Sequence, residues 1–168
     1  MTSELRILTD DPSDVSALQS LLERAPVYHV RVTGSPATPT AAEELLHDLP
    51  PDGDPADKFV YGVYVNGALV GCVDVARGYP GPDFAFIGLL LIDESLRGLG
   101  IGRSACGLIE REALSWGVST LRLAVLETNA EVVPFWEKMG FALTGERLTY
   151  VSGSVESHVL LMDKHIES

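Results

Sequence analysis

Three glycines at alternate positions stand out in residues 89–105, which read LLLIDESLRGLGIGRSA. An apolar run precedes them and apolar residues at helical spacing follow, so Gly98, Gly100 and Gly102 are expected in a loop between a strand and a helix. Glycine lets the backbone approach a ligand closely. The first turn of a helix presents unpaired N–H groups and a dipole that favours negative charge. The segment therefore predicts a phosphate or pyrophosphate site, to which Arg97 adds a positive charge.

Two other glycine-rich phosphate motifs do not fit this segment. A P-loop requires Gly-Lys-Ser/Thr, whereas Gly102 is followed by Arg103 and Ser104. A dinucleotide fingerprint requires G-x-G-x-x-G in an early βαβ unit, but here the third glycine comes one position too early and a hairpin precedes the loop. Both motifs are excluded by the residues themselves.

The N-terminal part of the chain predicts one strand and two helices. Leu5–Leu8 is a short apolar strand, and Pro12–Ala25 has a proline start and apolar residues at helical spacing. The segment Pro26–Pro39 has no clear period and is expected to be irregular. Thr40 and Glu43 are spaced as a capping box at the start of a second helix.

The central part of the chain predicts a β-hairpin. Phe59–Val65 and Ala68–Val75 are rich in β-branched and aromatic residues, and Asn66–Gly67 between them suits a type I′ turn. Gly78–Asp83 is a further turn, and Phe84–Ile92 is the strand that leads to the glycine-rich loop.

The C-terminal part predicts a helix, a strand, a short helix and two closing strands. Pro134 fits the short helix only if that helix begins near Glu131, because an interior proline removes a backbone hydrogen bond. Together the elements predict one α/β domain over residues 1–168, a mixed sheet with helices against it. The five segments are Ile101–Gly117, Thr120–Leu126, Asn129–Met139, Glu146–Ser152 and Ser157–Asp163.

The composition is that of a globular protein, with 46% hydrophobic and 21% charged residues among 168. A net charge of −12 repels phosphate backbones, so no nucleic-acid partner is expected. No secretory signal or membrane-spanning run is visible, and we expect a cytoplasmic protein with no membrane partner. Cys72 and Cys106 form no paired motif and are expected to be packing residues. The four histidines share no spacing, so no metal is expected.

These motifs together resemble the GNAT superfamily of N-acetyltransferases. Residues 97–102, RGLGIG, match that family's Q/R-x-x-G-x-G/A motif between a strand and a helix. Asn129, followed by FWEKMGF at 135–141, looks like the family's Asn near the end of the fifth strand and its closing aromatic–Glu-Lys-x-Gly-Phe element. The order of elements from about Leu5 to Asp163 also agrees, so the resemblance covers nearly the whole chain.

The resemblance implies a GNAT-like fold, with a central, mostly antiparallel sheet, a splay between strands 4 and 5, and helices on both faces. It implies acetyl-CoA as co-substrate, with the pyrophosphate on the glycine-rich loop and the pantetheine arm along the end of the fourth strand. A backbone N–H in residues 89–91 would stabilise the oxyanion of the tetrahedral intermediate. The residues so assigned to the cofactor are Leu90, Leu91, Ile92, Arg97, Gly98, Leu99, Gly100, Ile101, Gly102, Arg103, Asn129 and Trp136.

The implied reaction is direct attack of a primary amine on the thioester. Trp136 stands where the family often has a proton-donating Tyr, and an indole is no acid at neutral pH, so the acid is unassigned. The sequence does not identify the general base, because the fourth strand carries no titratable side chain and several residues elsewhere are candidates. They are Glu127, favoured for its place at a strand end beside the splay, Tyr79, Asp74, Tyr28 or His29, and a water chain ending on a distant carboxylate.

Other interpretations remain beside this one. The acceptor is a small amine or an exposed protein amine, and the sequence does not choose between them. The alternative function is a non-catalytic acyl-CoA-binding or sensing module of the same fold, because Trp136 and the fourth strand lack proton-transfer groups. A third possibility is a structural dimerisation domain, and a homodimer through an exposed strand is compatible with each. Asn129 also suits a helix cap, and Phe135 and Trp136 also suit core packing.

Overall fold

A seven-stranded mixed sheet is the centre of the computed structural model, which describes residues 2–152 and 155–167. The strands are β1 (Glu4–Ile7), β2 (Lys58–Val65), β3 (Ala68–Arg77), β4 (Phe84–Ile92), β5 (Thr120–Leu126), β6 (Ala142–Ser152) and β7 (Val155–His165). They lie side by side in the order β1-β2-β3-β4-β5-β7-β6. Only β4 and β5 pair in parallel; the other described pairs are antiparallel.

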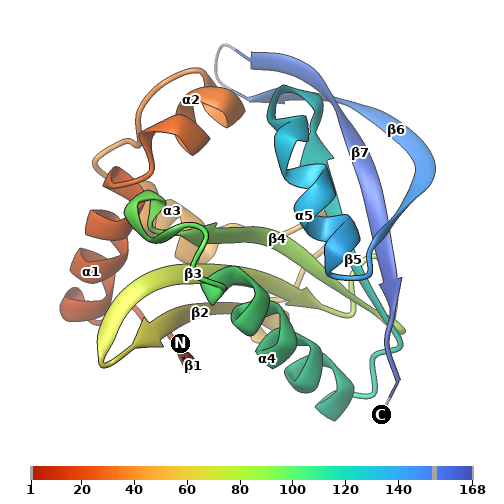
Figure 1. The fold of residues 1–168 in the computed structure, drawn as a ribbon, viewed down its shortest axis with the longest axis horizontal. Helices are drawn as coiled ribbons and strands as arrows, with labels where there is room; N and C mark the ends of the chain where they lie inside the picture. Colours follow the sequence, from red (N-terminus) through yellow and green to blue (C-terminus); the bar gives the residue numbers. More distant parts are fainter. Residues whose placement is uncertain (1, 153–154, 168) are drawn as a thin grey trace.

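Helices cover both faces of this sheet, as predicted. The α-helices are α1 (Pro12–Glu23), α2 (Pro26–Thr33), α3 (Ala41–His47), α4 (Ile101–Ser115) and α5 (Val133–Lys138). Three short 3-10 helices connect them to the strands: η1 (Pro55–Asp57), η2 (Glu94–Leu96) and η3 (Glu127–Val132). In Figure 1, α4 and α5 lie in front of the sheet, while β6 and β7 form a long curved hairpin at its side.

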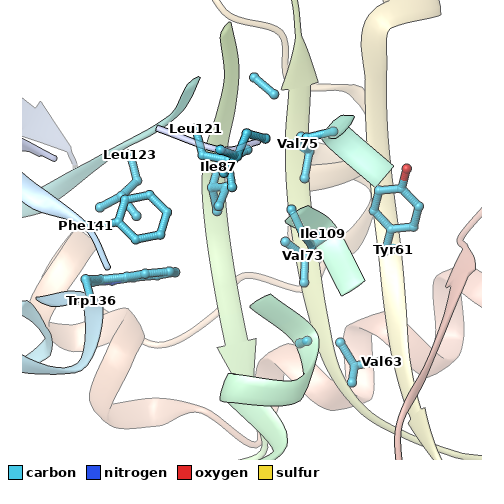
Figure 2. Packing of buried hydrophobic residues seen from close by; sticks show 14 of the residues in the cluster. Tyr61, Val63, Val73, Val75, Ile87, Ile109, Leu121, Leu123, Trp136 and Phe141 are labelled. Atoms are coloured by element: carbon cyan, nitrogen blue, oxygen red, sulfur yellow. The ribbon is translucent and has the colours of Figure 1, made fainter. Parts of the chain in front are cut away.

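The core consists of two apolar layers, one on each side of the sheet. Side chains alternate along a strand, so Val63 of β2 joins the layer beneath α4, whereas Val60 joins the layer beneath α1 and α3. Figure 2 shows the first layer, in which Val73 of β3 lies beside Ile109 of α4. The predicted α/β fold with a mixed sheet is confirmed.

The local signals around the hairpin predicted its structure correctly. Asn66 and Gly67 have φ angles of 51° and 79°, as a type I′ turn between β2 and β3 requires. β4 and β5 have the bounds expected from the sequence.

The prediction that Pro26–Pro39 is irregular is wrong for its first half, which forms α2. Pro26 lies in the first turn of α2, and Gly34, with φ of 80°, ends the helix in the left-handed conformation. No residue of α2 is fully buried, so the helix lacks the apolar stripe that periodicity analysis detects.

Two details of the predicted helix starts also need correction. Thr40 does precede α3, but its hydroxyl donates a hydrogen bond to Glu44 Oε1 at 2.7 Å, and its side chain caps no backbone N–H. The predicted helix over 129–139 divides into η3 and α5, and α5 begins at Val133 so that Pro134 lies in its first turn.

None of the helices formed by the described residues is long and apolar enough to cross a membrane.

Candidate active site

The sheet opens between its two central strands. β4 and β5 pair only from Phe84 with Thr120 to Ile87 with Leu123, although β4 continues to Ile92 and β5 to Leu126. Beyond the last pair, β4 stays bonded to β3 and β5 to β7. One edge of β4 is therefore without a strand partner over residues 88–92, which is the predicted splay.

A cavity of about 1110 Å³ occupies the splay. Its walls are the unpaired halves of β4 and β5, the glycine-rich loop with the start of α4, the helices α2 and α5, and part of the β6–β7 hairpin. Segments far apart in the sequence thus surround one space, of the size that small-molecule sites occupy.

A β-bulge in β4 shapes the wall of this cavity. Asp74 of β3 lies opposite Leu89, but the next residue, Val75, lies opposite Ile87, so Gly88 is the extra residue. A Cβ on Gly88 would lie 2.8 Å from Asp74 Oδ2. Gly88 lines the cavity, and its missing side chain leaves the Asp74 carboxylate next to that wall.

The glycine-rich loop delivers the N-terminus of α4 to the cavity. Gly98 and Gly100 both have φ of 81°, a conformation that costs little only for glycine. Gly102 is required for another reason, because a Cβ there would lie 3.2 Å from Phe135 Cζ. The N-cap residue of α4 is Gly100, and none of the described residues caps the first turn with its side chain, so the N–H groups of that turn are available to bind an anion.

The charged side chains on the cavity wall are mostly positive, although the net charge of the whole chain is negative. The net charge is −12, yet four arginines and two glutamates line the cavity. Arg97 and Arg103 lie at the glycine-rich loop; Arg97 is 3.7 Å from Glu94 Oε2, and Arg103 is exposed. The positive charge therefore gathers where a phosphate would meet the helix N-terminus.

Of the twelve residues assigned to the cofactor from the sequence, eleven line the cavity. Leu99 does not; its side chain is 48% exposed at the tip of the loop. Trp136 is 7% exposed and lies edge-on to Phe135 and Phe141, with ring centroids 5.0 and 5.2 Å away. It therefore combines core packing with a place on the cavity wall (Figure 2). The binding roles themselves stay predictions.

Asn129 lies on the cavity wall and is not a helix cap. It is an interior residue of η3 with non-helical φ and ψ of −122° and 29°. Its Oδ1 accepts a hydrogen bond from Arg31 of α2 at 3.5 Å. Arg31 also forms an ion pair of 3.1 Å with Glu131, and its carbonyl accepts a hydrogen bond of 2.8 Å from Thr128. α2 is thus tied to η3 across the cavity.

The three candidates for the general base occupy different places. Tyr79 lines the cavity, with its ring edge-on to Phe86. Asp74 lies behind Gly88 and pairs with Lys58 Nζ at 2.7 Å; burial raises the pKa of its carboxyl, and Lys58 opposes that rise. Glu127 lies outside the cavity lining, where Arg147 binds both carboxylate oxygens at 2.7 and 2.9 Å. Those hydrogen bonds lower the pKa of Glu127.

Tyr28 and His29, the other candidates for the base, and the two cysteines differ in their surroundings. Tyr28 lines the cavity, whereas His29 does not, and burial lowers the pKa of the His29 imidazole. Burial raises the pKa of Cys72 and of Cys106 to about 12, so neither is a thiolate at neutral pH. Within residues 2–152 and 155–167 no cluster of His, Cys, Asp or Glu is arranged to hold a metal ion.

Among the cavity-lining residues that sequence reasoning missed are Gly88, Arg31 and Glu146. A glycine inside a strand is itself a sign of a bulge, so Gly88 was detectable. Arg31 carried no signal because its segment has no clear period, and Glu146 carried none because a lone charge at the start of a predicted strand does not indicate a binding role.

Comparisons with known proteins agree with this geometry. The sequence profile of the acetyltransferase (GNAT) family matches residues 18–141. An acetyltransferase structure from Thermus thermophilus superposes with a TM-score of 0.74 at 23% identity, covering 99% of this chain and 98% of that one. The ribosomal-protein-S18-alanine N-acetyltransferase of Escherichia coli gives a TM-score of 0.71 at 17% identity, covering 99% and 96%.

A third structure includes the acyl donor. It is a Bacillus anthracis protein, provisionally named a streptothricin acetyltransferase, in complex with acetyl coenzyme A. Its TM-score is 0.57 at 18% identity, covering 66% of this chain and 63% of that one. At these identities the structural matches show a common fold. No curated protein sequence matches the chain.

Proposed function

The chain belongs to the acetyltransferase (GNAT) family, and we propose that it transfers an acetyl group from acetyl-CoA to a primary amine by direct attack on the thioester. One observation carries the proposal. The unpaired edge of β4 and the glycine-rich start of α4 open into the same cavity. A donor with a polar, extended arm and a pyrophosphate needs both features at once.

The residues present fit coenzyme A. The free N–H groups of the first turn of α4, with Arg97 and Arg103 beside them, suit the pyrophosphate. The unpaired polar groups of β4 over residues 88–92 suit the amides of the pantetheine arm, since an exposed strand edge pairs readily with an extended chain. Asn129 and Trp136 lie on the wall beside that edge.

The protein's contribution to the chemistry is positioning and charge stabilisation. Acetyl-CoA supplies an activated acyl group; the amine nitrogen bonds to its carbonyl carbon, the carbon–sulfur bond breaks, and the thiolate leaves. A backbone N–H of residues 89–91 stabilises the oxyanion that forms in between. Neither cysteine lines the cavity and both carry a raised pKa, which supports direct transfer over an acyl-cysteine route.

The amine must lose a proton, and Asp74 is the base that the geometry favours. Its carboxylate lies behind Gly88, next to the wall where the thioester would be held. A raised pKa brings its basicity nearer to neutral pH, as general base catalysis requires. Glu127 and Tyr79 remain the other candidates.

We also propose that the chain carries out this function as a single domain in the cytoplasm.

A non-catalytic acyl-CoA-binding module is the second candidate function. The observation that favours it is the indole of Trp136 on the cavity wall, at the position where the family often has a phenol, so that this position supplies no acid to the departing thiolate. Such a module would bind acetyl-CoA and acetylate nothing, so an assay of transfer separates the two.

The first test is stabilisation by acetyl-CoA, measured by thermal unfolding and compared between two charge reversals on α4. Arg103→Glu changes a residue on the cavity wall, and Arg111→Glu changes an exposed residue outside it, so the two variants have equal net charge. At a hundred times the dissociation constant, the ligand should stabilise the wild type and Arg111→Glu by about 2.7 kcal/mol. Arg103→Glu should bind about tenfold or more weakly, because it loses a charged contact.

The result decides the proposal. No stabilisation of the well-folded wild type by millimolar acetyl-CoA contradicts the transferase function and the binding module alike. Equal loss in both variants contradicts the assignment of the phosphate to the start of α4. Where binding is found, release of free coenzyme A in the presence of primary amines then establishes transfer.

A further inference from the structure

The cavity has a second side, away from the glycine-rich loop. Leu121 and Leu123 of β5 belong to the core layer beneath α4, so the residue between them, Arg122, lies on the opposite face of the sheet. In register with Arg122 are Phe86 of β4 and Asp163 of β7, which share that face. An acceptor would meet the thioester from this side, because α4 and its core close the other.

The charges on this side are paired, with one exception. Arg122 forms two hydrogen bonds with Asp163, at 2.7 and 2.8 Å, and Arg31 pairs with Glu131. Glu146 of β6 also lines the cavity; it is exposed and has no ion-pair partner among the described residues. Arg122 is held by Asp163, and Glu146 makes a smaller contribution to its raised pKa, so Glu146 is the carboxylate of this side that lacks an ion pair and attracts a cation.

The rest of this wall is apolar. Tyr79 packs edge-on against Phe86 with ring centroids 5.5 Å apart, and both line the cavity beside Pro80. Leu148 of β6 lines the cavity two residues from Glu146 and is 52% exposed. A large aliphatic side chain that is exposed on a cavity wall is removed from water when an apolar ligand covers it. Burial of this surface therefore favours binding of an apolar ligand.

We propose, on the basis of the transferase function above, that the acceptor is a small primary amine with an apolar body, its ammonium group drawn to Glu146 and its hydrocarbon part against Phe86, Tyr79 and Leu148. A polyhydroxylated amine fits this wall poorly, because each hydroxyl placed against hydrocarbon without a partner costs about 1–3 kcal/mol. Glu146 attracts the protonated amine; the proton leaves before attack, and the neutral nitrogen forms the amide bond.

The test compares two acceptors, 2-phenylethylamine and ethanolamine, which carry the same ammonium group on an apolar and on a polar body. Release of free coenzyme A gives kcat/KM for each. We expect the aromatic amine to be preferred by about tenfold or more, since burial of a phenyl group contributes about 1.5–3 kcal/mol. Acetyl-CoA binding is measured in parallel by thermal unfolding.

Three exposed positions allow variants that leave the fold intact. Glu146→Gln should raise KM for 2-phenylethylamine several-fold without changing the affinity for acetyl-CoA, whereas Glu156→Gln, on β7 and outside the cavity, should change neither. Leu148→Gln should lower the preference for 2-phenylethylamine over ethanolamine several-fold.

The outcomes separate this proposal from the one on which it rests. Equal use of both amines, a preference for ethanolamine, or identical kinetics in Glu146→Gln and Glu156→Gln would overturn the acceptor class while leaving transfer intact. If acetyl-CoA stabilises the protein but neither these two amines nor a peptide N-terminus is acetylated, the transferase function itself is wrong. Acetylation of the peptide alone overturns the small-amine acceptor.

Discussion

Asp74 and Glu127 illustrate how the surroundings of a carboxylate decide its chemistry. Both were candidates for the general base. Asp74 is largely removed from water, which raises its pKa although Lys58 Nζ lies 2.7 Å away. Glu127 is solvated and held by Arg147, and its pKa is lowered. A base that must be ionised at working pH and still accept a proton is better served by the first environment.

The pH dependence of two variants tests this difference. If Asp74 is the base, the ratio of kcat/KM between wild type and Asp74→Asn is about a hundredfold or more at neutral pH. The ratio falls towards one as pH drops through the raised pKa of Asp74, because the protonated carboxyl is no base. The ratio for Glu127→Gln should stay near one, because Glu127 lies outside the cavity lining, and it should be constant from about pH 5 to 9, because its lowered pKa keeps Glu127 ionised throughout.

Asp74→Asn also changes a buried ion pair, so a second variant is needed. Gly88→Ala keeps both Asp74 and Lys58 but places a methyl group 2.8 Å from Asp74 Oδ2, so the carboxylate must move. It should reduce kcat, and acetyl-CoA affinity is measured beside it because Gly88 also belongs to the edge of β4 proposed for the pantetheine arm. A ratio near one for Asp74→Asn at neutral pH, or a large ratio for Glu127→Gln, would transfer the role to Glu127 or Tyr79.

At the scale of elements, α2 is the part of the site that polar contacts hold in place. It has no fully buried residue, and Val27 and Val30 are 45% and 51% exposed. Its links to η3 are the hydrogen bond from Thr128 to the Arg31 carbonyl, the hydrogen bond from Arg31 to Asn129 and the ion pair of Arg31 with Glu131. An element with few buried apolar contacts opens at low free energy, so these links set how firmly this wall of the acceptor side is formed.

Thr128→Val removes one link while keeping the side-chain volume nearly constant. A net hydrogen-bond contribution of about 0.5–1.5 kcal/mol predicts amide exchange in residues 27–33 that is about two- to tenfold faster. The measurement is hydrogen–deuterium exchange by mass spectrometry, with α1 in the same sample as the internal control. Unchanged exchange in α2, or equal acceleration in α1, would show that packing and not this hydrogen bond holds the helix.

At the scale of the whole molecule, the sheet is stabilised from both faces. Leu18 of α1 is fully buried in one layer, and Ile109 of α4 is 2% exposed in the other. Both layers rest on the same strands, so loss of either one weakens the support for the splay.

Truncation in each layer should therefore cost comparable stability. Leu18→Ala and Ile109→Ala should each lower the free energy of unfolding by about 2–5 kcal/mol, whereas Leu143→Ala, at a side chain that is 49% exposed, should change it by about 0.5 kcal/mol or less. Urea denaturation measures all three. A cost below about 1 kcal/mol for Leu18→Ala would mean that α1 is peripheral to the fold.

Much of this protein is determined by short stretches of its sequence. Asn66–Gly67 specifies its turn because those two residues tolerate positive φ, and the glycine-rich loop specifies its own conformation for the same reason. β4 and β5 had the expected bounds because their composition alone indicates strands. The fold and the phosphate end of the cavity therefore followed from local patterns and from a resemblance built on them.

Most of the acceptor side was decided by tertiary structure, although a glycine inside a strand already indicates the bulge at Gly88. The helix α2, the bulge at Gly88, and the contacts of Glu127 and Glu146 depend on residues more than a dozen positions away in the chain. Glu127 stands at the strand end where the sequence favoured a base, yet Arg147 binds it outside the cavity, while Glu146 of the neighbouring hairpin lines the wall. Backbone conformation is set by neighbours in sequence, but the partner of a charge is set by neighbours in space.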